Sequence, residues 1–446
     1  MARRIFTPTR GAHSRGGSQQ RLQALSSRIP LAGSGGLAPS RRGWGGPTFL
    51  GLRHLVALVV VVIVVFVAVQ WFRGVPSPTF APAALTSLRL PGQAPAIPWP
   101  AGGTAAVSLP GVGLVGTSGD DQAVPIASVA KVLTAYVVLQ DHPLSLGQTG
   151  PTITVPDSVV AAYQAGAAGQ QSEVKVSSGE TITELQALEG LLIASGNDMA
   201  ILLAQWDMGS TDAFVARANT AAKNLGLTAT HMTDPSGLDQ ATVSSAVDLV
   251  RLGQAAMANA VFKSIVGMPQ ATLPEAGLLY NYDYDLGHNG IIGIKTGTDG
   301  AAGGCFLFEA QQAVSGQTVS VIGVLLGQQG VSPITTVLAN AKTLVQAAFA
   351  AVRPVPLVSP TQTVGTVTTA WGSHVTVTAP DAPQVLAWPG LELQGHIKAH
   401  RLSGPVAAGA VVGTLEVDTG SKVVDIPLKT TAAVPGPGPG WRLTRL

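Results

Sequence analysis

Residues 125–136 have the sequence PIASVAKVLTAY, which places Ser128 and Lys131 three residues apart at the start of an apolar helix. This spacing puts both side chains on one helical face, and the first turn of a helix leaves backbone N–H groups free that favour negative charge nearby. A serine hydroxyl becomes a good nucleophile when a neighbouring group accepts its proton, which a lysine can do once its pKa is lowered. The stretch therefore contains a candidate nucleophile and a candidate base.

A second Ser-x-x-Lys pattern, at Ser172 and Lys175, shows that this spacing alone does not identify a site. The second copy lies among alternating polar residues and is followed by Ser177, Ser178 and Gly179. We interpret it as an exposed strand end. Only the Ser128 copy opens a long apolar segment.

The charge distribution limits the possible partners. The chain has 446 residues and a net charge of +2, but residues 1–54 hold nine arginines and no acidic residue. The remaining chain has 17 basic and 24 acidic side chains, a net charge of −7. Nucleic-acid binding by the folded part is therefore not expected. The single cysteine, Cys305, excludes an internal disulfide framework and a multi-cysteine metal site.

The N-terminal region predicts a membrane anchor. Residues 1–54 are expected to form a basic cytoplasmic segment, disordered over 1–48, with a nucleic-acid-binding arm as the alternative. Residues 55–72, LVALVVVVIVVFVAVQWF, carry no charge. As a helix they span roughly 27 Å, close to the thickness of a bilayer core. We expect one transmembrane helix.

Flanking charges predict the orientation of this helix. Arg41, Arg42 and Arg53 precede it and only Arg73 follows closely, so the N-terminus should be cytoplasmic. A cleaved signal peptide is the alternative, although the leader is long for one. Residues 73–103 are rich in proline and are expected to form a semi-extended linker that lifts a domain off the membrane.

Two folded domains are expected after this linker. In residues 104–352, alternating apolar residues over 105–115, the turn signal Ser118-Gly119-Asp120 and then Val124 predict a strand pair before the Ser128 helix. Thr181 with Glu184 predicts a capping box. Further helices are expected at 199–206, about 211–226, 245–257 and 334–352, with strands at 291–294, 306–308 and 318–326. Residues 353–434 alternate short β-rich runs with turns and predict a small all-β domain. The Pro-Gly-rich tail, residues 435–446, should be flexible.

Three short motifs occur in a defined order: Ser128-Val129-Ala130-Lys131, Ser195-Gly196-Asn197 after a helix, and Lys295-Thr296-Gly297 on a strand. Together they are typical of serine β-lactamases and penicillin-binding proteins. Residues 105–350 resemble the low-molecular-mass penicillin-binding proteins of the D-alanyl-D-alanine carboxypeptidase type, including GLLIASGNDMAILLA, DPSGL and GIKTGTDGAAGGC. The resemblance implies an α/β (α+β) fold of the β-lactamase/transpeptidase type, with helices around an antiparallel sheet. The short stretch LSGPVAAGAVVGTLEV likewise resembles part of the accessory domain of some of these carboxypeptidases.

The resemblance also implies roles for eight residues. Ser128 would be the nucleophile, Lys131 its general base, and Ser195 the relay of a proton to the leaving amine. Asn197 would contact a substrate amide or Lys131. Lys295 would lower the pKa values of Ser195 and Lys131 and help to hold the substrate carboxylate. The remaining implied substrate-binding residues are Thr296, Gly297 and Thr298, and backbone N–H groups of Ser128 and Thr298 would form an oxyanion hole.

Two positions depart from the family pattern. Ala130 stands where the family usually has threonine, and Asp299 stands where a threonine is frequent. An acidic side chain beside a carboxylate site would repel the substrate, so Asp299 is expected to weaken substrate affinity. Neither change removes a reacting group.

The predicted function is a serine-type D-alanyl-D-alanine carboxypeptidase on the outer face of a bacterial plasma membrane, anchored by one helix. It would use no cofactor or metal, act on peptidoglycan stem peptides and be acylated by β-lactam antibiotics. The alternatives are a D,D-endopeptidase, a β-lactamase, or a peptidoglycan-binding scaffold that has lost turnover. Cys305 is expected to be a small buried residue rather than a nucleophile.

Overall fold

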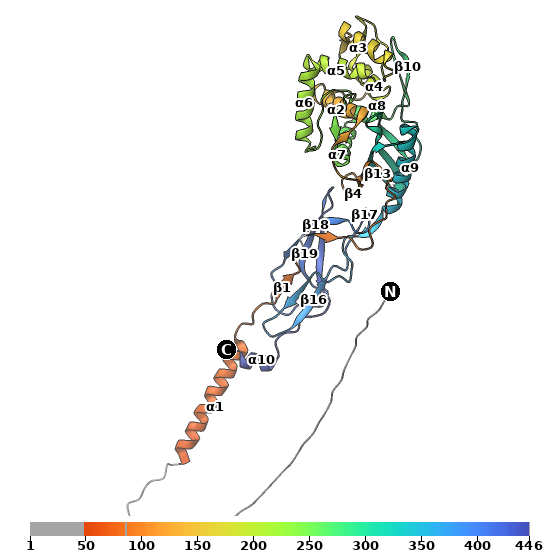
Figure 1. Cartoon of the computed structure of the whole chain (residues 1–446). Coiled ribbons are helices and arrows are strands. Elements are labelled where there is room, and N and C mark those ends of the chain that lie inside the picture. The colour runs from red at the N-terminus through yellow and green to blue at the C-terminus, as the bar shows by residue number, and fades with distance from the viewer. Residues whose placement is uncertain (1–48, 85–86, 446) are drawn as a thin grey trace, which may run out of the picture. The chain divides into compact units, whose positions relative to one another are not determined.

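The computed structural model describes residues 49–84 and 87–445. These residues fall into two compact units that divide after Phe72 (Figure 1). The predicted disorder of residues 1–48 lies outside the described residues. In the first unit, helix α1 runs over Phe49–Phe72, so residues 49–54 belong to the helix rather than to the basic segment. Its part Gly51–Phe72 has a mean hydropathy of 3.0 and is long and apolar enough to cross a membrane.

A five-stranded antiparallel sheet is the centre of the second unit, with the strand order β11-β12-β13-β3-β4. Strand β3 therefore pairs with β13, which lies far along the chain, and among the described strands β4 pairs only with β3. This arrangement confirms the predicted antiparallel sheet. The strand bounds are β3 Thr104–Leu109, β4 Gly113–Ser118, β11 Ile291–Asp299, β12 Gly303–Val314 and β13 Gln317–Gln328.

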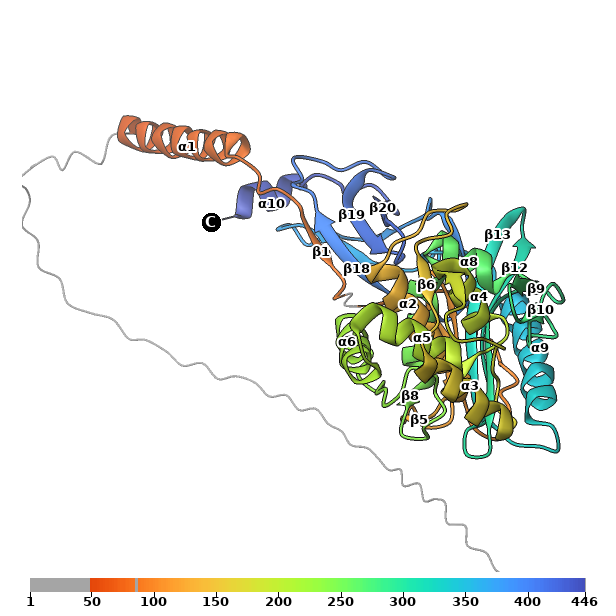
Figure 2. The same ribbon diagram turned by 90° about the horizontal axis from the view of Figure 1, so that it is seen from above.

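Helices cover both faces of this sheet (Figure 2). Helix α9, Pro333–Ala351, packs on β12 and β13. The opposite face carries α7, Ala246–Met257, and the helices that pack around α2. Successive side chains of β12 point to opposite faces of the sheet. Phe306 and Phe308 belong to the hydrophobic core that contains α9, whereas Leu307 belongs to the core on the other face. The other helices are α2 Lys131–Asp141, α3 Asp157–Ala168, α4 Glu184–Leu192, α5 Asn197–Met208, α6 Thr211–Asn224 and α8 Ala260–Val266.

Short strand pairs join these layers, and one of them changes the predicted start of α4. Strand β7, Thr181–Thr183, pairs with β6, Thr152–Thr154. Thr181 is therefore in a strand, and the capping box is formed by Thr183 and Gln186 instead of Thr181 and Glu184. The other pairs are β5 Val124–Pro125 with β8 Val243–Ser244, β9 Gln270–Leu273 with β10 Gly277–Tyr280, and β14 Arg353–Pro356 with β17 Gln384–Ala387.

A second, seven-stranded sheet contains five strands that follow α9 and two that precede β3. It agrees with the predicted all-β character of the C-terminal part. Its order is β1-β15-β16-β20-β19-β18-β2. The bounds are β1 Thr79–Pro82, β2 Leu88–Arg89, β15 Gly365–Thr368, β16 His374–Thr378, β18 Glu392–Ala399, β19 Val411–Asp418 and β20 Val423–Thr430.

The segment expected to be a linker contributes two strands to this sheet. Strand β1 pairs with β15, and β2 pairs with β18. Leu88 and Leu90 are 2% and 1% exposed. Proline fits here because β1 is an edge strand and ends at Pro82, where a missing N–H costs no ladder bond. The chain therefore runs through the C-terminal sheet before it enters the five-stranded sheet.

Two further segments differ from the sequence-based expectation. Residues 172–178 form no strand, although Val174 and Val176 are buried, so the second Ser-x-x-Lys copy lies on an irregular segment. In the tail, helix α10 covers Pro439–Thr444, and the Trp371 indole donates a hydrogen bond to the Pro435 carbonyl.

Candidate active site

The Ser128 motif forms a tight turn rather than the first turn of an α-helix. Residues Ala127–Ala130 are a 3₁₀-helix, and α2 begins at Lys131. Ala127 has φ +44°, a left-handed backbone that costs a non-glycine residue free energy and is frequent at functional sites. Ser128 is half-buried and follows this strained residue directly.

Lys131 is fully buried beneath Ser128 and makes three hydrogen bonds. Its Nζ donates to Ser128 Oγ at 2.9 Å, to Asn197 Oδ1 at 2.7 Å and to the Ser236 carbonyl at 2.9 Å. No carboxylate of the described residues accepts from it directly. The two motif residues that the sequence placed three apart are therefore in contact, and a residue from a distant segment fixes the amine between them.

Burial controls the charge of Lys131. It lowers the pKa of the ammonium from 10.5 to about 7, because a charged group loses its hydration in the interior. The negative charges of nearby carboxylates raise the pKa of Lys131. Asp234 has the largest effect, followed by Glu173 and Asp198. The lowered pKa makes the neutral amine accessible near neutral pH, and this is the state that can accept a proton from Ser128.

The second motif connects α4 to α5. Ser195 has φ +61° and is 3% exposed, and its hydroxyl has no hydrogen-bond partner among the described residues. Asn197 is the first residue of α5, so its side chain projects from a helix start toward Lys131. The Asn197 amide also donates to Gln171 Oε1 at 3.4 Å.

The third motif lies on β11, an edge strand of the five-stranded sheet. Gly297 permits a close approach to the Ser128 turn, because a Cβ atom there would be 2.9 Å from the Ser128 backbone nitrogen. Thr296 is buried, whereas Thr298 is exposed on the same strand. A free strand edge beside the serine offers backbone groups to an extended peptide.

Lys295 is buried and, among the described residues, forms no hydrogen bond with the other two motifs. Its Nζ donates to the Thr296 carbonyl at 3.0 Å. Burial lowers its pKa well below 10.5, the positive charge of Lys131 lowers it further, and Asp283 raises it. The low pKa of Lys131 comes from burial, so the expected role of Lys295 in lowering it is not the main cause.

A cavity of about 180 Å³ brings the motifs together. Five of the eight predicted residues line it. Lys131, Asn197 and Lys295 do not, and Asn197 instead lines a second cavity of about 560 Å³. The cavity is bounded by Ser128, Ser172, Ser195, Tyr282, Tyr284, Thr296, Gly297, Thr298 and Ile334.

The structure shows the surroundings of the two departures from the family pattern. Ala130 is buried against the turn at Gly237, where an added Cβ atom would lie 2.9 Å from the Ala130 Cβ. Asp299 Oδ1 accepts hydrogen bonds from the backbone of Ala301 and Ala302, and Asp299 is not part of the cavity lining. The carboxylate stabilises the β11–β12 turn, which weakens the argument that it repels a substrate.

Sequence reasoning missed several residues around the site. The Ser236 carbonyl binds Lys131, and the Asp234 carboxylate organises that turn by accepting from Ser236 N, Leu238 N and Thr242 Oγ1. The DPSGL sequence at 234–238 indicates a turn, but no local signal shows that this turn contacts Lys131. Nothing in the spacing of Tyr282 or Tyr284 pointed to the cavity.

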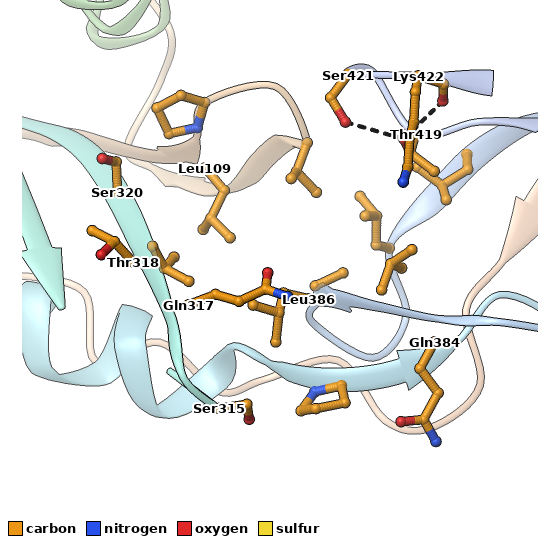
Figure 3. Close-up of a pocket in the computed structure, with 18 residues that line it drawn as sticks. Leu109, Ser315, Gln317, Thr318, Ser320, Gln384, Leu386, Thr419, Ser421 and Lys422 are labelled. Carbon is orange, nitrogen blue, oxygen red and sulfur yellow. Dashed lines mark hydrogen bonds between the residues drawn. The ribbon is translucent and has the colours of Figure 1, made fainter. Parts of the chain in front are cut away.

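Two features elsewhere are separate from this site. A cavity of about 640 Å³ lies between the β12–β13 hairpin and the C-terminal strands, with Gln317, Gln384 and Lys422 on its wall, and it contains none of the predicted site residues (Figure 3). Cys305 is buried, and burial raises the pKa of its thiol to about 12, which makes it a poor nucleophile.

Comparisons with known proteins agree on one family. A family model described as D-alanyl-D-alanine carboxypeptidase matches residues 114–330. A D-alanyl-D-alanine carboxypeptidase of Mycobacterium tuberculosis is 41% identical over 194 residues, which cover 42% of this chain and 62% of the relative. One from Streptomyces sp. strain K15 is 31% identical over 225 residues, which cover 46% and 72%.

A solved structure supports the same assignment. The crystal structure of an evolved penicillin-binding protein homologue from Mycobacterium tuberculosis is 34% identical and has a TM-score of 0.51. The match covers 58% of this chain and 96% of that one. The similarity thus includes nearly the whole of the solved domain but leaves the remainder of this chain unmatched.

Proposed function

Because this chain belongs to the D-alanyl-D-alanine carboxypeptidase family of serine peptidases, we propose that it removes the terminal D-alanine from peptidoglycan stem peptides through an acyl-enzyme on Ser128. The observation that carries this proposal is the 2.9 Å contact between Lys131 Nζ and Ser128 Oγ. A buried amine with a pKa of about 7 is suited to accept the serine proton at physiological pH.

The proposed reaction begins with the neutral Lys131 amine. It accepts the Ser128 proton while Oγ attacks the carbonyl between the two D-alanines. Backbone N–H groups of Ser128 and Thr298 stabilise the oxyanion, each such donor being worth about 3 kcal/mol in comparable enzymes. Ser195 relays the proton from the Lys131 ammonium to the nitrogen of the leaving D-alanine, the carbon–nitrogen bond breaks, and the Lys131 amine is neutral again. Water then attacks the ester carbonyl and gives up one proton to Lys131. Lys131 returns this proton to Ser128 Oγ as the ester bond breaks and the shortened peptide leaves.

Substrate binding uses the edge of β11 in this proposal. The peptide extends along the strand, with its terminal carboxylate held by Thr296, Thr298 and the charge of Lys295. Gly297 keeps the strand close to the Ser128 turn, and Asn197 contacts a substrate amide or Lys131. β-Lactam antibiotics present a similar carboxylate and acylating carbonyl, so they act as covalent inhibitors in this proposal.

We propose an extracytoplasmic location for the catalytic part. The candidate span in α1 supports membrane anchoring, and the arginines on its N-terminal side support a cytoplasmic N-terminus. Because Cys305 is buried, single added cysteines can report topology. A membrane-impermeant thiol reagent should label Glu275→Cys in intact cells and Ser18→Cys only after permeabilisation. The reverse pattern contradicts this orientation.

The activity is tested with the full-length chain in detergent. A peptide ending in D-Ala-D-Ala should release free D-alanine, and Ser128→Ala should abolish the release. Ser172→Ala provides the control, because Ser172 is the other Ser-x-x-Lys serine and lines the same cavity. Release that persists in Ser128→Ala refutes the assignment of the nucleophile.

Three further measurements on the same protein distinguish the related activities. Cleavage of crosslinked muropeptides without release of terminal D-alanine would show an endopeptidase. Rapid hydrolysis of penicillin without a persistent adduct would show a β-lactamase. Binding of peptidoglycan without acylation would show a scaffold.

A further inference from the structure

Two carboxyl groups outside the three motifs lie next to the Lys131 centre. The irregular segment 171–174 binds the start of α5 through backbone contacts: Asn197 N donates to the Ser172 carbonyl at 2.9 Å, and Val174 N donates to Asp198 Oδ1 at 3.0 Å. Asp198 N in turn donates to Glu173 Oε2 at 2.9 Å. Glu173 and Asp198 are thereby held side by side, with Asp198 directly after Asn197.

Asp198 is enclosed, whereas Glu173 is half-buried on the wall of a cavity of about 560 Å³. Asp198 is 0% exposed, and its Oδ2 has no hydrogen-bond donor. Neither group forms an ion pair within the described part of the chain. Helix α3 closes over Glu173 so tightly that a Cβ atom on Gly166 would come within 1.9 Å of Glu173 Oε1. Two adjacent acids in such a place do not both ionise easily, since like charges repel and are poorly solvated.

A proton held on Asp198 fits its buried, unpartnered oxygen. The pKa of Asp198 is raised to about 8, mainly by burial and also by a side-chain hydrogen bond to Glu173 and the Glu173 charge, whereas backbone hydrogen bonds lower it. Once protonated, Asp198 is a neutral carboxylic acid, so Oδ2 is not a buried charge without a partner.

The charged groups that face Lys131 come from four parts of the fold. Asp234 lies on the turn after α6, Glu173 on the irregular segment, Asp198 on α5 and Lys295 on β11. The Asp234 carboxylate is occupied by hydrogen bonds from its own turn. Of these three acidic groups, only Asp198 has a buried side-chain oxygen without a hydrogen-bond partner among the described residues.

We propose that Glu173 and Asp198 act together as positioning residues that set the charge of Lys131 before Ser128 is acylated, an inference that rests on the proposed function. Negative charge on these two groups stabilises the ammonium formed when Lys131 accepts the Ser128 proton. A proton held on Asp198 limits that charge, so Lys131 is not locked in its protonated form in the resting enzyme. Their backbone contacts also hold Asn197 against the Lys131 amine.

The test measures the acylation rate constant of the full-length chain with a fluorescent penicillin between about pH 5 and pH 9. In wild type the rate should rise as Lys131 loses its proton. The double variant Glu173→Gln with Asp198→Asn removes the negative charge and keeps the polar side chains. This change should move the acid limb of the pH profile to lower pH by about half a unit to one unit, because a nearby negative charge favours the ammonium.

Two further variants make the result specific. Glu173→Gln alone should move the limb in the same direction by less, because the remaining Asp198 is still buried and only partly ionised. Glu275→Gln, at an exposed glutamate, should leave the limb in place.

The outcomes are distinguishable. The proposal is overturned if the acid limb of the pH profile of the double variant lies at the wild-type pH. If the double variant does not fold, the same result in the Glu173→Gln variant overturns the proposal. A rate reduced by the same factor at every pH overturns it too, because that result indicates only a structural role. Failure of wild type to be acylated instead contradicts the proposed function.

Discussion

Gly237 packs directly against Ala127, so that a Cβ atom at position 237 would come within 1.9 Å of the Ala127 carbonyl oxygen. Gly237 also has φ +79°, a backbone conformation that favours glycine. Through this contact the Asp234–Leu238 turn lies against the 3₁₀-helix that presents Ser128. The same turn supplies the Ser236 carbonyl to Lys131.

Gly237→Ala should therefore separate the turn from the Ser128 helix. We expect the penicillin acylation rate to fall at least about tenfold and the free energy of unfolding to fall by about 2 kcal/mol or more, from steric overlap and the unfavourable φ. Gly226→Ala is the matched control, since Gly226 has φ +71° but no neighbouring atom within 4 Å of an added Cβ. Equal effects of the two substitutions would contradict the packing argument.

Lys131→Arg should abolish base catalysis, because a guanidinium keeps its proton throughout the physiological range. The acylation rate should fall about a thousandfold, within the usual contribution of a general base. In wild type, the rate should rise through about pH 7, where the buried amine becomes neutral. Lys175→Arg, in the other Ser-x-x-Lys copy, should show the wild-type profile. A wild-type rate that does not change across this range would contradict the role of Lys131.

Asn197→Asp should move the acid limb in the opposite direction to the double variant of Glu173 and Asp198. The new carboxylate would lie where Asn197 Oδ1 accepts from Lys131 at 2.7 Å. An adjacent negative charge raises the pKa of an ammonium, so the neutral amine appears only at higher pH, by about one unit. Asn197→Ala removes the same hydrogen bond without adding charge. A limb at the same pH in both variants would show that charge at position 197 does not reach Lys131.

Thr183→Ala should destabilise the chain by about 1 kcal/mol, because the Thr183 side chain accepts from Gln186 N at the start of α4. Thr181→Ala should cost less, since Thr181 is exposed in β7. Chemical denaturation of the two variants measures the difference. A larger loss in Thr181→Ala would favour the cap expected from the sequence.

Local sequence patterns correctly predicted helices whose signals lie within the helix itself. The apolar periodicity after Lys131 and the Ser245 cap gave the correct helices, and the three motifs converge near one cavity. The cap of α4 was misplaced because Thr-x-x-Glu at 181–184 and Thr-x-x-Gln at 183–186 match the same pattern. Pairing with β6 determines which threonine is in the strand, and that pairing is not local information.

Long-range contacts explain the other differences. The proline-rich segment 73–103 has the composition of a linker, but Phe80 pairs with Val367, a partner nearly three hundred residues away. The contacts of Lys131 with Ser236, and of Asp198 with Glu173, also join distant segments. A single sequence shows the chemistry of each residue, whereas these juxtapositions arise only from the fold.

The central claim is that Ser128 is the acylated residue. The most direct measurement is mass spectrometry of the full-length chain after reaction with penicillin, followed by proteolysis to locate the adduct. The account predicts one penicilloyl group per chain, attached to the peptide that contains Ser128 and absent in Ser128→Ala. An adduct on the Ser172 or Ser195 peptide, or one that persists in Ser128→Ala, would contradict it.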